Sequence, residues 1–107
     1  MKINDLERLQ KKAEIFQSLG QPIRLGIVEL LRDGEMCVCD IAERIGAERS
    51  NISRHLSVLE RASVLGSRKD GQRVLYRLRA GCVLDFLSCV TEMLRNNIAC
   101  DVQRMEQ

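Results

Sequence analysis

The chain lacks any long apolar run. Its longest apolar stretches are far shorter than the roughly 20 residues that a membrane-spanning helix needs, and the amino terminus, Met1-Lys2-Ile3-Asn4-Asp5, has no apolar signal core. Repeats and low-complexity segments are also absent. We therefore expect a cytoplasmic protein that does not engage a membrane. A hydrophobic content of 45% over 107 residues predicts one folded domain, residues 1–107, with a modest core.

Features of enzyme active sites are scarce as well. The chain has a single histidine, His55, and a Cys/His enzyme needs a base oriented beside its nucleophile. His55 is poorly placed for that role, because it falls within a helix that we expect to face another molecule. No phosphate-binding loop and no pair of catalytic carboxylates is recognisable. The sequence therefore predicts a protein that is not an enzyme.

The most informative segment is 50–59, where apolar and polar residues separate onto opposite faces of a short helix. Ile52, Leu56 and Leu59 recur at helical spacing and can anchor in a core. The other face carries short hydrogen-bonding groups and one guanidinium, namely Ser50, Ser53, Arg54 and Ser57. Such a face suits a helix pressed into a DNA groove, whereas a merely solvated helix would usually carry Glu and Lys there.

The flanking segments support a DNA-binding module. Apolar residues at 38, 41 and 45 mark an amphipathic helix that ends at Gly46. It lies a few residues before the helix over 50–59, which we call the reading helix, and this is helix-turn-helix spacing. After it, two β-leaning runs, 64–69 and 73–78, flank Asp70-Gly71-Gln72, a strong hairpin signal. The hairpin tip is ringed by Arg68, Lys69 and Arg73. Together these pieces predict a winged helix-turn-helix.

Charge is distributed unevenly along the chain. Residues 48–79 hold eight Lys or Arg against three Asp or Glu, a net charge of +5, so that the other residues sum to −3 in a chain of net charge +2. The positive charge lies where DNA would bind, and phosphate attraction acts locally over roughly 8–10 Å. A solvated charged surface without a partner is the alternative interpretation.

Helical periodicity fills most of the remaining sequence. We predict a first helix that starts at an Asn4–Glu7 capping pair and runs to Gly20, a second over about 22–32 with Pro22 at its start, and a last one over about 82–103. The expected fold is mainly α with a small β-hairpin wing. The terminal helices carry more apolar residues than a small core can bury, which favours a homodimer that packs through these helices. The two reading helices of the dimer would lie ~34 Å apart on an inverted-repeat operator. The alternative is that the last helix only covers the core of a monomer.

Five cysteines in a chain expected to be cytosolic are not typical of structural disulfides. Metal binding, redox sensing and plain burial remain open. Cys37 and Cys39 lie where the helix before the reading helix begins. Residues i and i+2 diverge on a regular helix, but a cap residue has non-helical dihedrals, so the two sulfurs can approach each other. The helix dipole would lower the thiol pKa there, and thiolates select soft ions.

Two motifs in this order resemble the ArsR/SmtB family of winged-helix metal-responsive repressors: Glu-Met-Cys-Val-Cys-Asp-Ile at 35–41 and Ser-Asn-Ile-Ser-Arg-His-Leu at 50–56. The resemblance covers essentially the whole chain. It implies a dimeric repressor that leaves operator DNA when arsenic(III) or antimony(III) binds, with cadmium(II) and lead(II) as further candidate inducers. It also implies that Cys37 and Cys39 are thiolate ligands.

The chain departs from the family pattern in two places. Ala42 stands where compact arsenic sites have a third cysteine, and the amino-terminal cysteine arm of the cadmium/lead sensors is absent. We take Cys100 as the first candidate for a third ligand. The other candidates are Cys82 and Cys89. Because the acid and histidine of the family's zinc site on the last helix are missing, we reject a zinc site of that kind.

The DNA contacts follow from the predicted elements. Arg54 can donate two hydrogen bonds to guanine, and Ser50, Ser53 and Ser57 can bond base edges or phosphates. Arg49, at the helix start, is expected to meet phosphate, and the wing residues Arg68, Lys69 and Arg73 the DNA backbone or minor groove. An alternative is a repressor of the same fold whose thiols are oxidised or persulfidated.

Overall fold

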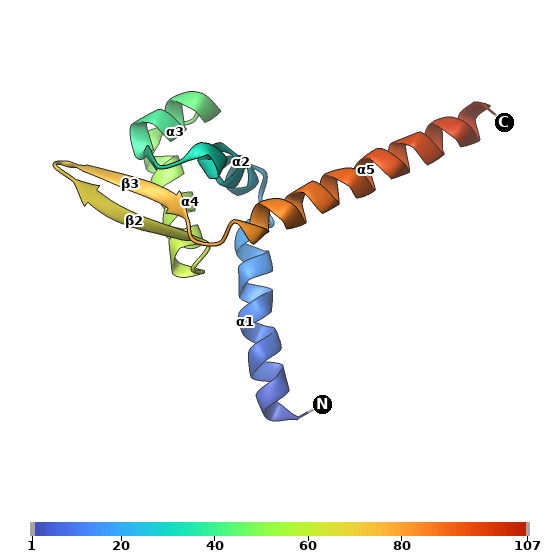
Figure 1. Ribbon diagram of the computed structural model, residues 1–107, viewed down its shortest axis with the longest axis horizontal. Helices are drawn as coiled ribbons and strands as arrows, with labels where there is room; N and C mark the ends of the chain where they lie inside the picture. The colour runs from blue at the N-terminus through green and yellow to red at the C-terminus, as the bar shows by residue number, and fades with distance from the viewer. Residues whose placement is uncertain (1, 107) are drawn as a thin grey trace.

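The structure is a computed structural model that describes the backbone of residues 2–106 and the side chains of residues 2 and 4–97. The described residues form five α-helices and a three-stranded antiparallel sheet, and Figure 1 labels the helices and the strands β2 and β3. In chain order the elements are α1 (Ile3–Leu19), α2 (Pro22–Leu30), a 3-10 turn (Leu31–Asp33), β1 (Met36–Cys37), α3 (Val38–Ile45), α4 (Arg49–Arg61), β2 (Leu65–Asp70), β3 (Arg73–Leu78) and α5 (Cys82–Glu106). The predicted winged helix-turn-helix with a mainly α fold is confirmed.

The core lies between α2, α3, α4 and the hairpin. Its fully buried large side chains are Ile27, Val28, Ile41, Ile52, Leu56, Leu59 and Leu65. The three predicted anchors of the reading helix are therefore confirmed, because the spacing 52, 56, 59 places them on one face of α4. Burying such a side chain stabilises a fold by about 1.5–3 kcal/mol, so α4 is held firmly by its inner face.

Glycines with positive φ form two of the turns that the fold needs. Gly46 adopts the left-handed conformation at φ +80° and ends α3, which separates α3 from α4 by three residues, 46–48. Gly71 has φ +65° and opens the two-residue loop between Asp70 and Arg73. A positive φ at the first loop position alone fits a type II′ hairpin turn. Both turns match the sequence prediction.

The terminal helices project away from this body in different directions (Figure 1), and the molecule measures 60 × 43 × 22 Å along its principal axes. Large apolar side chains are exposed on both helices: Leu6, Leu9, Ile15, Phe16, Phe86, Met93 and Leu94. The helices meet where the rings of Phe16 and Phe86 pack edge to face, with centroids 5.5 Å apart. None of the helices in the described part has the length and hydropathy required to cross a bilayer.

Several local predictions are corrected by the structure. The Asn4–Glu7 capping pair is wrong: α1 begins one residue before Asn4, its N-cap is Lys2, and no side chain caps it. The second helix ends at Leu30, where the chain tightens into the 3-10 turn instead of continuing to Arg32. The wing has a third strand, β1. It is only two residues long, which is too short for a sequence pattern to predict it.

Candidate nucleic-acid interface and thiol site

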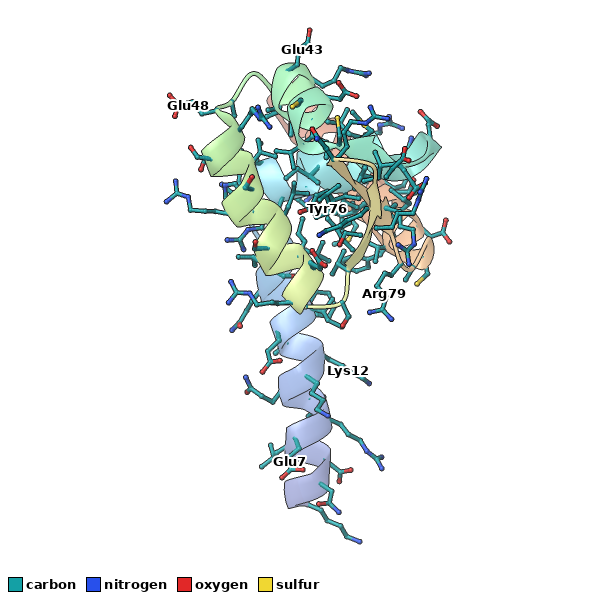
Figure 2. The ribbon with its side chains drawn as sticks, turned by 90° about the vertical axis from the view of Figure 1, so that its left-hand side faces the viewer. Glu7, Lys12, Glu43, Glu48, Tyr76 and Arg79 are labelled. Atoms are coloured by element: carbon teal, nitrogen blue, oxygen red, sulfur yellow. The ribbon has the colours of Figure 1, made fainter. Side chains whose placement is uncertain are left out.

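The outer face of α4 is open to solvent, as a DNA-reading helix requires. Its predicted contact residues are all exposed: Arg49, Ser50, Ser53, Arg54 and Ser57. Figure 2 shows α4 beside the hairpin, with Glu48 at the turn that leads into the helix. Since the opposite face of α4 is buried in the core, these five side chains are presented together on one surface.

The guanidinium of Arg54 is held in place by a neighbour that the sequence reading did not single out. Arg54 Nη2 donates a 3.2 Å hydrogen bond to Asn51 Oδ1, one turn earlier on α4. Residues three apart lie next to each other on a helix, so this contact could have been found from spacing alone. It restricts the rotamers of a long, exposed side chain.

His55 performs a structural task on the inner side of the same helix. Arg24 Nε, on α2, donates a 3.1 Å hydrogen bond to His55 Nδ1, and Arg24 Nη1 reaches the carbonyl oxygen of Ser18 at 3.4 Å. This network ties α4 to α2 and to the end of α1. Burial lowers the pKa of His55 below its usual value, and the charges of Arg24 and Arg54 lower it further. His55 is thus a neutral hydrogen-bond acceptor for Arg24 in this arrangement.

Folding stability should depend on pH through His55. Its pKa is lowered in the folded state, so the unfolded chain binds more protons below about pH 6.5. The stability that the neutral ring contributes is present above that pH and is lost as pH falls through the folded pKa. The urea midpoint should therefore drop between about pH 7.5 and 5, and His55→Asn, which keeps an acceptor for Arg24, should show a smaller drop. An equal drop in both proteins would contradict this role.

The wing arginines are engaged within the protein. Arg68 Nε lies 2.8 Å from Glu35 Oε2, and Arg68 Nη2 donates a second bond of 3.0 Å to Oε1. This pairing lowers the pKa of the Glu35 carboxyl. Arg73 pairs more loosely with Asp70 at 3.6 Å, while Lys69 is exposed and takes part in no ion pair among residues 4–97. Of the three wing residues predicted to contact DNA, only Lys69 forms no ion pair with an acidic side chain among residues 4–97.

The two cysteines of the predicted box differ in their surroundings. Cys37 is the N-cap of α3, with extended dihedrals of φ −86° and ψ 163°, so the predicted non-helical cap is confirmed. Its side chain is buried, at 7% exposure, whereas Cys39 in the first turn is exposed. Cys37 is also the last residue of β1 and pairs with Leu75 of β3. Solvent therefore reaches the Cys39 thiol more readily than the thiol of Cys37.

A complete metal site is not formed within the portion of one chain whose side chains are placed: no group of three or more His, Cys, Asp or Glu side chains there could hold an ion. Cys82 and Cys89 are exposed on α5, and the side chain of Cys100 lies outside the described residues. Figure 1 shows that α5 runs away from α3.

Comparison with known proteins gives a consistent result. The family described as "Bacterial regulatory protein, arsR family" matches residues 21–65. The uncharacterized HTH-type transcriptional regulator MJ1325 of Methanocaldococcus jannaschii is 36% identical over 89 residues, which cover 82% of this chain and all of that protein. The arsenical resistance operon repressor of Escherichia coli is 44% identical over 66 residues, or 61% of this chain and 56% of the repressor.

A solved structure supports the fold. The homodimeric winged helix-turn-helix DNA-binding domain Mb0332 of Mycobacterium bovis superimposes with a TM-score of 0.81 at 24% identity, covering 92% of this chain and 91% of that one. The matched relatives are DNA-binding transcriptional regulators and not enzymes. With the exposed reading face of α4, its buried anchors and the wing, these similarities establish that the chain belongs to the ArsR family of bacterial regulatory proteins.

Proposed function

We propose that the protein is a repressor that binds inverted-repeat operator DNA as a homodimer and is released when arsenite or antimonite binds Cys37 and Cys39. The observation that carries the proposal is the position of these cysteines at the N-terminus of α3, which packs directly against the reading helix α4. A shift of α3 would therefore act on the face of α4 that we propose to meet DNA. The similarity to the E. coli arsenical resistance repressor supports this choice of inducer.

The DNA contacts that we propose are those of the exposed face of α4 and the wing. Arg54 reads a guanine, Ser50, Ser53 and Ser57 bond base edges or phosphates, and Arg49 and Lys69 bind phosphate. Arg73 can turn from Asp70 to the DNA backbone, because exposed ion pairs of this kind are weak. Arg68 would have to leave Glu35 to do the same.

The exposed apolar faces of the terminal helices support the proposed homodimer. Seven large apolar side chains are exposed on α1 and α5, more than a small soluble monomer usually leaves in one region. A second copy related by two-fold symmetry would cover them and present two α4 helices to successive major grooves. The M. bovis domain of the same fold is homodimeric.

The soft donor set determines which inducers we propose. Two thiolates favour arsenic(III), antimony(III), cadmium(II) or lead(II) over hard ions, and Cys100, Cys89 or Cys82 of α5 can supply a third sulfur. The second candidate is a repressor of the same fold that responds to oxidants or persulfides, and the exposure of Cys39, Cys82 and Cys89 favours it. Cys37 and Cys39 are too close in sequence for an unstrained disulfide.

Fluorescence anisotropy on labelled inverted-repeat DNA tests the proposal. We expect binding with a stoichiometry of two 12.2 kDa chains per operator, and release on adding arsenite but not peroxide. Release by peroxide alone would support the redox-sensing alternative. Failure to bind any inverted-repeat DNA selected from random sequence would refute operator binding. Sedimentation of the free protein checks the dimer independently.

A further inference from the structure

Three residues from three different strands form one row across the wing sheet. In the strand order β1-β3-β2, Cys37 lies opposite Leu75, and Leu75 lies opposite Arg68. Directly paired residues of antiparallel strands carry their side chains on the same face of a sheet. The thiol of the candidate site and the wing arginine therefore share a face, although they are 31 residues apart in sequence.

The side chain of Arg68, on β2, reaches Glu35 in the segment that leads into β1 and Cys37. Its guanidinium makes three contacts of 2.8–3.1 Å with both carboxylate oxygens of Glu35, and Glu35 is two residues before Cys37. A two-pronged guanidinium–carboxylate pair fixes orientation as well as distance. Exposed single ion pairs contribute little to stability, and this two-pronged geometry is the exception.

The neighbouring residue of β2 is bound on the opposite face. Ser67 Oγ donates a 2.9 Å hydrogen bond to Glu60 Oε1 near the end of α4. Consecutive residues of one strand thus connect β2 to two different elements, Ser67 to the reading helix and Arg68 to the segment before α3. A path of side-chain contacts therefore runs from Glu35 through Arg68 to β2, and from β2 through Ser67 to α4.

We infer that Glu35 and Arg68 are positioning residues that transmit occupation of the Cys37–Cys39 site to the wing. The inference rests on the proposed function, because it assumes that an ion is captured by these thiols. Cys37 is buried, and the inference takes it to move when an ion binds both sulfurs. The 35–37 segment moves with it, and the Glu35–Arg68 pair carries that motion into β2. In the free protein Arg68 is held by Glu35.

The test compares Glu35→Gln, Arg68→Gln and the double variant with the parent. The measured quantity is the ratio of operator affinities without and with arsenite, and arsenite binding is followed separately by thiolate absorbance. Allosteric ratios are typically about 5–150-fold. We expect each single variant to reduce the ratio at least ~5-fold, and the double variant to add less than ~2-fold more, as two members of one contact should. Arsenite absorbance should be unchanged.

Glu43→Gln is the matched control, because it removes the same charge from an exposed residue of α3 that takes part in none of the ion pairs within residues 4–97; it should keep the parent ratio. If Glu35→Gln leaves the affinity ratio unchanged, the inference is overturned while the proposed function stands. The same holds if Arg68→Gln lowers DNA affinity equally with and without arsenite. If arsenite binds to the parent without releasing DNA, the proposed function fails and the inference fails with it. The two failures are thus distinguishable.

Discussion

Replacing Cys37 and Cys39 together with serine is expected to abolish release by arsenite while operator binding is retained. Serine hydroxyls are hard and stay protonated, so they do not bind a soft ion. Neither sulfur lies on the exposed face of α4, so the DNA contacts are preserved. Titrating arsenite into the protein–operator complex and following anisotropy measures the effect. Release by arsenite that persists in the double variant would show that the site lies elsewhere.

The buried position of Cys37 calls for a control on folding. A hydroxyl placed there without a partner costs about 1–3 kcal/mol, which could weaken DNA binding for a trivial reason. Cys37→Ala avoids that cost and should give the same loss of response. Single Cys→Ser variants at 82, 89 and 100 then identify the third sulfur, because the thiolate absorbance band falls with each ligand removed. A band unchanged in all three would mean that the ion is held by two sulfurs.

Replacing Arg54 with alanine is expected to weaken operator binding by about 1–3 kcal/mol, or roughly 5–150-fold, with a much smaller effect on random DNA. The guanidinium is exposed on α4 and hydrogen-bonded to Asn51, and its loss would remove the base contact that we propose for it. Parallel titrations with operator and random duplexes measure both affinities.

Arg49→Ala provides the matched comparison, because it removes an equal charge from the first turn of the same helix. A phosphate contact carries no sequence information, so this variant should weaken operator and random DNA alike and reduce the salt dependence of binding. If Arg54→Ala also weakens both duplexes equally, Arg54 is a phosphate contact and the operator is read by other residues.

The helical periodicity of the sequence predicted where the helices lie, but it predicted the residues at which they begin and end less accurately. The anchors of α4 could be identified because three apolar residues at helical spacing leave only one face to bury. The hairpin could be placed because Asp70-Gly71 favours a tight turn. The start of α1 was misjudged because the Asn4–Glu7 pattern is only a local signal, and helix ends are decided by small energy differences.

In the candidate site, too, local features could be predicted from the sequence and contacts between distant residues could not. The residue types, the Cys-x-Cys spacing and the polar face of α4 are local properties, so the sequence by itself determined a DNA-reading helix preceded by a pair of thiols. Only the tertiary structure decided that Cys37 is buried as part of a third strand, that His55 accepts from Arg24, and that Arg68 binds Glu35. The last two contacts join residues 31 and 33 positions apart. Such contacts depend on how elements pack, and packing is not encoded in the spacing of any one segment.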